Sequence, residues 1–537
     1  MSADPLRQAR EWLAQDPDPD TRVALSDLIE HGADLSDFFG AKLEFGTAGL
    51  RGELGPGPNR MNRVTVMRAA AGLAAVLGPG KHVVIGYDAR HKSAAFARDT
   101  AAVLTGAGLH ASILPSALPT PVLAFAVKHL GADAGVMVTA SHNPPRDNGY
   151  KVYWGDGSQI VPPVDSEISA AIDAVGRVDE LPLGHPGKLT ELDESLLDAY
   201  LRAVTALPLG DARELRVAYT PLHGVGGGTL TGAFLQAGFA SPVAVEEQRN
   251  PDPDFPTVSF PHPEEPGAMD LALALGAKIG ADLVLANDPD ADRCAVAVRH
   301  GGAYRMLTGD EVGALLGEHM ITHTSGDRMV ATTIVSSTLL GKIAAAHGVR
   351  FGETLTGFKW IMRAGPGLVF GYEEALGYSC GDVVADKDGI GAALVIAGMA
   401  AEARRAGRTL VDLLDDQARR YGLHATAPLS FRVADLSLIA EAMAALRAEP
   451  PSELGGFAVE RVDDLAWGDG GLPPTEGLRF VLSGGARVVV RPSGTEPKLK
   501  CYLEVVEPVT GEVAEARATA ARSLESLAAG LKRAIAL

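Results

Sequence analysis

Short apolar runs alternate along the chain with longer segments in which apolar residues recur at helical spacing. The runs that predict buried strands are residues 82–87, 135–139, 215–219, 281–286, 329–335, 368–371 and 487–490. The segments that predict helices are residues 64–77, 94–107, 229–237, 270–279, 309–319 and 513–537. This alternation is typical of α/β units with largely parallel sheets.

Changes in composition divide this pattern into domains. The chain has 537 residues, more than one hydrophobic core accommodates, since domains usually contain about 100–200 residues. Proline and glycine gather at 181–187, and the pattern changes again at 322–327 and 421–428. Six prolines and several acids make 248–266 an extended loop. The domains expected are residues 1–205, with an N-terminal helical extension, 206–322, 323–425 and 426–537.

Charge and cysteine usage exclude several classes of protein. The chain has 48 Lys and Arg against 67 Asp and Glu, a net charge of −19, which argues against a nucleic-acid binder. Cys294, Cys380 and Cys501 lie far apart, so neither a disulfide framework nor a zinc site is expected. The N-terminus has no apolar signal core, and the apolar stretch 389–401 is too short to span a bilayer. We therefore expect a cytoplasmic protein without nucleic-acid or membrane partners.

A sharp change from apolar to polar residues marks the end of the run 135–139. Ser141, His142 and Asn143 follow this run, and Pro144 prevents the strand from continuing. A hydroxyl presented at a strand end beside a histidine is a common way to expose a nucleophile. A Ser/Asn turn that closes the strand would look the same, so the residues alone leave both interpretations open.

Three aspartates at alternate positions directly follow another predicted strand. Asp288, Asp290 and Asp292 can converge on one hard divalent cation through oxygen ligands. A Ca²⁺-binding EF-hand loop would need Gly at its sixth position and Glu at its twelfth, where this chain has Arg293 and Arg299. The spacing therefore favours a Mg²⁺ site with open positions for a phosphoryl oxygen, with a solvated acidic turn as the alternative.

A basic turn that contains glycine follows the last predicted strand. Arg491 offers a forked donor for phosphate oxygens, and the turn adds hydroxyls and backbone N–H groups. These groups and further positive charge come from Ser493, Gly494, Thr495, Lys498 and Lys500. The Gly-Lys-Ser/Thr ending of a P-loop is absent, so the turn predicts phosphate binding without implying a nucleotide. A solvated basic turn is the alternative.

Five further residues have chemistry that depends on their surroundings. Glu373 and Glu374 follow a predicted strand and can accept hydrogen bonds from vicinal sugar hydroxyls, although paired glutamates often begin a solvated helix. Lys151 and Lys387 are candidate general acids or bases if they are desolvated or lie beside another cation, although most lysines are surface residues. A glycine-rich loop carries Arg51, and a flexible turn explains that loop equally well.

Four of these segments, in this order, resemble the α-D-phosphohexomutase superfamily, the phosphoglucomutase and phosphomannomutase enzymes. The resemblance covers about residues 40–505 and rests on 139–144 (TASHNP), 288–293 (DPDADR), 371–374 (GYEE) and 491–497 (RPSGTEP). The glycine-rich loop, GTAGLRG, is similar to the branch that contains phosphoglucomutase-2-like and phosphopentomutase-like members. The resemblance implies three related α/β domains with mixed, largely parallel sheets, and a C-terminal α+β domain, around a central cleft.

The resemblance also implies a role for each segment. Ser141 would be the phosphoserine and would hold one Mg²⁺ together with Asp288, Asp290 and Asp292. The other catalytic residues would be Arg51 in the first loop and, near the proton transfers, His142, Lys151 and Lys387. The substrate contacts would come from Thr356, Gly357, Glu373, Glu374, Arg491, Ser493, Gly494 and Thr495.

The activity implied is the reversible interconversion of hexose 1-phosphate and hexose 6-phosphate, with glucose and mannose as the first candidates. The intermediate would be a bisphosphorylated sugar, which would also act as activator or primer. A phosphopentomutase of the same branch is the alternative, and a relative that makes sugar bisphosphates is less favoured. Ala375 stands where many glucose or mannose members carry Ser or another polar residue, so the resemblance does not specify the sugar. A sugar-phosphate-binding protein without catalysis is a further alternative, whereas a serine hydrolase is excluded because no Gly-x-Ser-x-Gly surrounds Ser141. We expect a monomer or homodimer.

Overall fold

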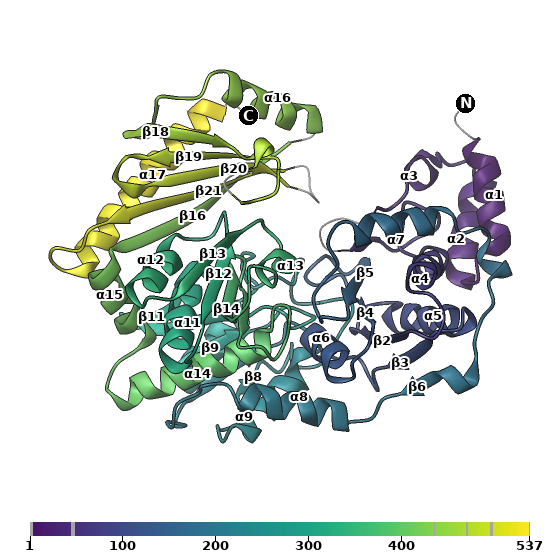
Figure 1. Cartoon of the computed structure of the whole chain (residues 1–537), viewed down its shortest axis with the longest axis horizontal. Helices are drawn as coiled ribbons and strands as arrows, with labels where there is room; N and C mark the ends of the chain where they lie inside the picture. The colour runs from purple at the N-terminus through teal and green to yellow at the C-terminus, as the bar shows by residue number, and fades with distance from the viewer. Residues whose placement is uncertain (1–3, 45–48, 434, 469–470, 494–497, 536–537) are drawn as a thin grey trace. The chain divides into compact units, whose positions relative to one another are not determined.

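The computed structural model describes residues 4–44, 49–433, 435–468, 471–493 and 498–535. The chain divides into two compact units, whose elements are labelled in Figure 1. The first unit comprises Met1–Met306 and Gly377–Glu402, and the second comprises Leu307–Leu376 and Ala403–Leu537. The segment Gly377–Glu402 therefore belongs to the first unit, although it follows Leu307–Leu376 of the second unit in sequence.

A mixed sheet forms the N-terminal part of the first unit. Across the sheet its strands are β1 (Leu50–Glu53), β5 (Asp147–Trp154), β4 (Ala134–Val138), β2 (His82–Tyr87), β3 (His110–Ile113) and β6 (Leu189–Glu191). The strands β4, β2, β3 and β6 pair in parallel, whereas β5 pairs antiparallel with β4, and β1 pairs antiparallel with β5. All of β4 is buried, which explains why its sequence is continuously apolar.

Helices surround that sheet and extend the unit at its N-terminus. They are α4 (Arg63–Leu77), α5 (Ser93–Gly106), α6 (Thr120–His129), α7 (Val164–Asp173) and α8 (Ser195–Thr205), with the short helices η1 (Val178–Glu180) and η2 (Pro186–Lys188). The N-terminal extension contains α1 (Pro5–Gln15), α2 (Pro19–Glu30) and α3 (Ser36–Phe39). Trp12 and Leu25 of the extension pack with Val64 and Met67 of α4 in one buried cluster. This apolar contact makes the extension part of the first unit.

A second mixed sheet completes the first unit. Its strand order is β11 (Ala303–Met306), β10 (Ala295–His300), β9 (Leu283–Ala286), β7 (Val217–Thr220) and β8 (Val243–Ala244). The pairs β9–β7 and β7–β8 are parallel, whereas the pairs β10–β9 and β10–β11 are antiparallel. The remaining elements are α9 (Gly226–Gln236), α10 (Asp270–Ile279), β15 (Gly377–Cys380) and α14 (Gly389–Arg405), whose last turn passes into the second unit.

The second unit contains a parallel sheet followed by an antiparallel one. The strands β13 (Arg350–Thr354), β12 (Met329–Thr333) and β14 (Leu368–Glu373) pair in parallel. Their helices are α11 (Gly309–His323), α12 (Leu339–Ala346), α13 (Phe358–Ile361) and α15 (Leu410–Tyr421). The strand order of the parallel sheet places the ends of β12 and β14 side by side, so the polar segments that follow them become neighbours.

The antiparallel sheet is the C-terminal half of the second unit. Its order is β16 (Leu423–Arg432), β21 (Lys498–Glu507), β20 (Arg487–Pro492), β19 (Leu478–Leu482), β18 (Phe457–Asp464) and β17 (Glu453–Leu454). The elements that accompany it are α16 (Leu436–Ala448), η3 (Leu465–Trp467), η4 (Ser483–Gly485) and α17 (Val513–Ile535). Alternate residues of the central strands, among them Phe480, Val488 and Leu503, share a buried cluster with Leu527 and Leu531 of α17.

The fold class predicted from the sequence is confirmed: the described residues form three mixed or parallel sheets and one antiparallel C-terminal sheet. The predicted strand 82–87 and helix 270–279 coincide with β2 and α10. The antiparallel strands β5, β10 and β11 were not predicted. Cys294, Cys380 and Cys501 are buried free thiols. None of the helices within the described ranges has both the length and the apolar character needed to cross a membrane.

Candidate active site

Ser141 is buried at the end of β4 and adopts an unusual backbone conformation. Its φ is +52°, in the left-handed region that non-glycine residues seldom adopt, and it is 2% exposed. Its backbone N–H donates to Oγ1 of Thr139 (2.8 Å). Its Oγ donates to Oδ2 of Asp288 (2.9 Å) and lies 3.2 Å from Nδ1 of His142. The structure thus brings a predicted nucleophile against a predicted metal ligand that is 147 residues away in sequence.

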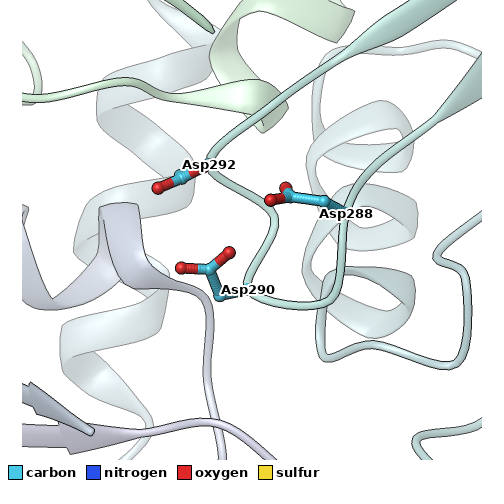
Figure 2. Close-up of side chains that lie close together, drawn as sticks. All are labelled: Asp288, Asp290 and Asp292. Atoms are coloured by element: carbon cyan, nitrogen blue, oxygen red, sulfur yellow. The ribbon is translucent and has the colours of Figure 1, made fainter. Parts of the chain in front are cut away.

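The three aspartates lie in the loop between β9 and β10. Figure 2 shows Asp288, Asp290 and Asp292 turned toward one another, and one oxygen of each lies within 4.8 Å of the others. The backbone N–H of Arg293 donates to Oδ1 of Asp288 (3.0 Å), which helps to hold the loop closed. Thr120, the first residue of α6, donates to Oδ2 of Asp290 (2.7 Å) and so joins the loop to the first sheet.

The donor set of this loop fits a divalent cation. In the part of the chain that the structure describes, Oδ1 of Asp290 and Oδ1 of Asp292 are buried and accept no hydrogen bond. Burial, followed by the charges of Asp290 and Asp292, raises the pKa of Asp288 well above its usual range. Carboxylate oxygens crowded in this way are the ligands that Mg²⁺ prefers, and a cation would relieve their mutual repulsion. The residues present therefore fit the metal expected from the sequence.

Two lysines contact the same aspartates. Lys151 lies on the unpredicted strand β5, and its Nζ is 2.8 Å from Oδ2 of Asp290 and 3.1 Å from Oδ2 of Asp292. Burial acts to lower the pKa of Lys151, but the two carboxylates outweigh burial and raise it. Lys387 is 3.4 Å from Oδ2 of Asp292 and 3.5 Å from Oδ1 of Asp386. Both lysines are therefore buried, and each contacts Oδ2 of Asp292; their acid/base role stays a prediction.

Imidazole and guanidinium groups complete the surroundings of Ser141. Burial, and then the positive charge of Arg293, lowers the pKa of His142 well below its usual value, so this ring is neutral near pH 7. Arg51 lies on β1, and its Nη1 donates to Oδ1 of Asn143 (3.1 Å), so β1 contacts the serine loop, residues 139–146 between β4 and β5. The structure places both predicted residues, His142 and Arg51, beside Ser141 within the first unit.

The residues predicted to bind sugar hydroxyls lie in the second unit, and each has a different hydrogen-bond partner. The backbone N–H of Gly357, the residue before α13, donates to Oε1 of Glu373 (2.8 Å). This contact joins the loop of Thr356 and Gly357 to the end of β14. Oε2 of Glu374 accepts from Oγ of Ser336 (3.1 Å), and burial, together with the neighbouring Glu373 carboxylate, raises the pKa of Glu374 to about 7.

The predicted phosphate-binding turn begins at the end of β20. Arg491 lies opposite Lys500 of β21, and the backbone N–H of Ser493 donates to the carbonyl of Lys498 (2.9 Å). Arg491 also hydrogen-bonds the side chain of Tyr502, whose pKa burial and then Glu374 raise. Within the second unit, the hydroxyl of Tyr502 is thus influenced by both Arg491 and Glu374. Gly494 and Thr495 lie outside the described residues.

Sequence reasoning missed two residues that contact the serine loop. Arg90 donates to the carbonyl of Ser141 (2.6 Å), and the ring of His262 packs edge-to-face against His142 with centroids 4.5 Å apart. Arg90 follows the end of β2, the same kind of position that marked Ser141 as a candidate. His262 lies in the proline-rich loop 248–266, whose composition indicated only an irregular segment.

Four models of one family match the chain in succession. Their descriptions are Phosphoglucomutase/phosphomannomutase, alpha/beta/alpha domain I (residues 42–178), domain II (198–302), domain III (308–421) and the C-terminal domain (429–520). Together these matches span well over half of the chain. Each carries one of the four segments on which the sequence resemblance rests.

Curated relatives and solved structures agree with these matches. A Haemophilus influenzae protein named "Probable phosphomannomutase" is 45% identical over 83% of this chain and 93% of its own length. A human phosphopentomutase is 36% identical over 94% of this chain and 91% of its own length. A crystal structure provisionally described as a phosphomannomutase of Thermus thermophilus is 27% identical, with a TM-score of 0.70 over 90% of this chain and 99% of that one.

Proposed function

This chain belongs to the phosphoglucomutase/phosphomannomutase family, and from that premise we propose that it interconverts hexose 1-phosphates and hexose 6-phosphates. It is an intramolecular phosphotransferase of the isomerase class. The observation that carries the proposal is the 2.9 Å contact between Oγ of Ser141 and Oδ2 of Asp288, because it joins a nucleophile to a carboxylate cluster. A structural turn would not need three buried aspartates beside one serine.

Ser141 acts as the carrier of the phosphoryl group. A hydroxyl of the sugar phosphate attacks the phosphorus of phosphoserine, so that a new O–P bond forms and the Oγ–P bond breaks. The attacking hydroxyl loses its proton to a base in the pocket, and the departing Oγ takes up a proton from an acid in the pocket, which restores the hydroxyl of Ser141. The bisphosphorylated sugar then turns round and returns its other phosphoryl group to Ser141.

The residues around Ser141 balance the charge of this transfer. Asp288, Asp290, Asp292 and Oγ of Ser141 would hold Mg²⁺, which when bound withdraws negative charge from the transferring phosphoryl group. The first-loop guanidinium of Arg51 adds positive charge from the protein itself. The groups that exchange protons with the sugar hydroxyls are His142, Lys151 and Lys387.

The second unit supplies the substrate contacts. Glu373 and Glu374 accept hydrogen bonds from sugar hydroxyls, and the connection between Gly357 and Glu373 supports a shared role for the loop of Thr356 and Gly357. The phosphate that is not reacting binds to the turn that starts at Arg491. Its further contacts are Ser493, Gly494 and Thr495. A forked guanidinium with hydroxyls and backbone donors suits either end of the sugar, because it recognises phosphate rather than the ring.

A phosphopentomutase is a second candidate function, favoured by a specific observation. The human phosphopentomutase and the fission-yeast protein named "Probable phosphoribomutase" match 94% and 93% of this chain, against 83% for the phosphomannomutase relative. The higher identity of the phosphomannomutase relative, 45% against 36% and 38%, favours the hexose reaction. A sugar bisphosphate as primer, the cytoplasmic location, the oligomeric state and the domain limits 1–205, 206–322, 323–425 and 426–537 stay predictions.

A substrate panel tests the proposal. Purified protein with Mg²⁺ is assayed on glucose 1-phosphate, mannose 1-phosphate and ribose 1-phosphate, alongside Ser141→Ala and the exposed control Ser166→Ala. We expect turnover of a hexose phosphate, loss of at least about 1,000-fold in Ser141→Ala, and no change in the control. Full activity of a folded Ser141→Ala variant contradicts the mechanism, and turnover of ribose 1-phosphate alone selects the second candidate.

A further inference from the structure

The side chain of Arg90 is buried beneath the serine loop and binds its backbone. The side chain is 1% exposed. Nη2 donates to the carbonyls of Ser141 and Asn143 (both 2.6 Å), and Nη1 donates to those of Pro144 (2.8 Å) and Asp147 (3.1 Å). One guanidinium therefore satisfies four carbonyl groups along a single turn of the chain.

Ser141 needs an external partner to keep its backbone conformation. At φ +52° the backbone of a residue with a side chain is strained, and such a conformation persists when its surroundings over-determine it. Here the N–H of Ser141 donates to Oγ1 of Thr139, and its carbonyl accepts from Arg90. Because both peptide groups of Ser141 are held, the direction of Oγ is set before any ligand binds.

Arg90 is itself held from two sides. Its Nε lies 3.4 Å from Oδ2 of Asp88, a residue that is also buried. The ring of Phe255 lies against the guanidinium, with the carbon at its centre 4.9 Å from the ring centroid. Phe255 is 2% exposed and belongs to the proline-rich loop 248–266. A planar cation can stack on an aromatic face while its edge donates to carbonyls, which an ammonium group cannot do.

We propose that Arg90 is a positioning residue for phosphoryl transfer, and that Phe255 of the proline-rich loop keeps its guanidinium in place. This inference rests on the proposed function for its kinetic consequences. Its guanidinium donates to backbone carbonyls, so its role is to hold the chain and not to contact sugar or phosphate. It fixes the backbone of Ser141 so that Oγ stays directed at Asp288. The proline-rich loop thereby gains a role in the reaction that its composition did not indicate.

Substitutions that keep the charge or the volume test this role. Arg90→Lys retains a cation without the fork, and Phe255→Leu retains an apolar side chain without the aromatic face. The matched control is Arg63→Lys, since Arg63 also forms a forked ion pair in this unit, with Asp99 (2.6 and 2.7 Å). We expect Arg90→Lys to lower kcat about 100-fold with KM within about threefold, Phe255→Leu to lower kcat about tenfold, and the control to keep kcat.

Chemical rescue and crystallography separate positioning from general stability. Millimolar guanidinium chloride is expected to restore part of the kcat of Arg90→Ala and nothing in Ser141→Ala, because a purely structural loss would not recover. A crystal structure of Arg90→Lys is expected to show Ser141 outside the left-handed region. If Arg90→Lys does not fold, the decision falls to Phe255→Leu, where an unchanged kcat overturns the proposal.

Failure of this inference is distinguishable from failure of the proposed function. An active wild-type enzyme together with a folded Arg90→Lys variant of unchanged kcat overturns the positioning role alone. A wild-type protein inactive on all the sugar phosphates contradicts the proposed function, and the backbone of Ser141 in Arg90→Lys crystals then decides the inference: an unchanged left-handed φ overturns it.

Discussion

In the first unit the carboxylates of Asp290 and Asp292 face the ammonium group of Lys151, whereas in the second unit the carboxyl group of Glu374 faces hydroxyls of Thr333 and Ser336. Burial raises the pKa of a carboxyl group in both places. The cation reverses that effect for Asp290, whose pKa lies below its usual range, while Glu374 titrates at about 7. Asp290 is therefore ionised near neutral pH, whereas Glu374 is only partly ionised there.

The difference matches the chemistry proposed for each cluster. A carboxylate that stays ionised, as that of Asp290 does, suits a divalent cation, since metal ligands must be deprotonated. A carboxyl group that gains and loses a proton near pH 7 can both donate and accept hydrogen bonds, which suits sugar hydroxyls. The partner of a buried acid, and not burial alone, therefore decides what it can bind.

The largest expected effect comes from Asp290→Asn. The amide removes one charge from the cluster and leaves Lys151 with a weaker partner, so we expect at least about 1,000-fold loss of kcat and weaker Mg²⁺ binding. Titration calorimetry with Mg²⁺ and steady-state assays measure both, with the exposed Asp198→Asn as control. Activity in excess EDTA, or wild-type Mg²⁺ affinity in Asp290→Asn, contradicts the metal assignment.

The next largest expected effect is on stability, and it comes from a buried ion pair in the second unit. Glu504 lies 3.0 Å from Nη2 of Arg487 and accepts from Ser337 (2.7 Å), and, although burial opposes the shift, Arg487 lowers the pKa of Glu504 to about 2. We expect Glu504→Gln to lower the free energy of unfolding by about 3 kcal/mol, because the buried guanidinium of Arg487 loses the nearer of its two carboxylates and keeps only Glu353, at 3.4 Å. Denaturant titrations at pH 7 measure this loss.

The same carboxylate predicts a direction for acid sensitivity. Since its pKa is depressed in the folded state, the stability contributed by Glu504 is present above about pH 4.5 and is lost as the pH falls toward about 2. Glu504→Gln lacks this contribution, so its free energy of unfolding should change less than that of the wild type over that range. Parallel curves for the two proteins would refute the role of Glu504.

The smallest expected effect is that of Glu374→Gln. Above pH 7 the variant loses an ionised acceptor, and we expect about a tenfold loss of kcat/KM at pH 8 and a smaller loss at pH 6. The pKa of Glu374 is raised on folding, so the free energy of unfolding of the wild type decreases as the pH rises from about 4.5 to about 7. This decrease is absent in the variant. pH–rate profiles and thermal unfolding measure both, and identical pH profiles would remove the contrast between the two clusters.

Much of the fold and of the site could be predicted because both leave local signals. Continuous apolar runs marked β2, β4 and β9, and the polar residues that follow β4 and β9 marked Ser141 and the three aspartates. Parallel strands collect such residues at one edge of a sheet, so their convergence could be expected. The antiparallel strand β5 was missed, because polar residues occupy its first half. The position of Lys151 on this strand could therefore not be predicted.

Sequence alone determined the residue types and their order: a serine after one strand, alternate aspartates after another, and paired glutamates and an arginine after two more. Tertiary structure decided what each of them faces. Three hydrogen bonds join segments that are distant in sequence: Ser141 to Asp288, Lys151 to Asp290, and Arg90 to the carbonyl of Ser141. Arg90 follows a predicted strand, as Ser141 does, but it binds backbone carbonyls, which every residue possesses, so the sequence could not predict its partners.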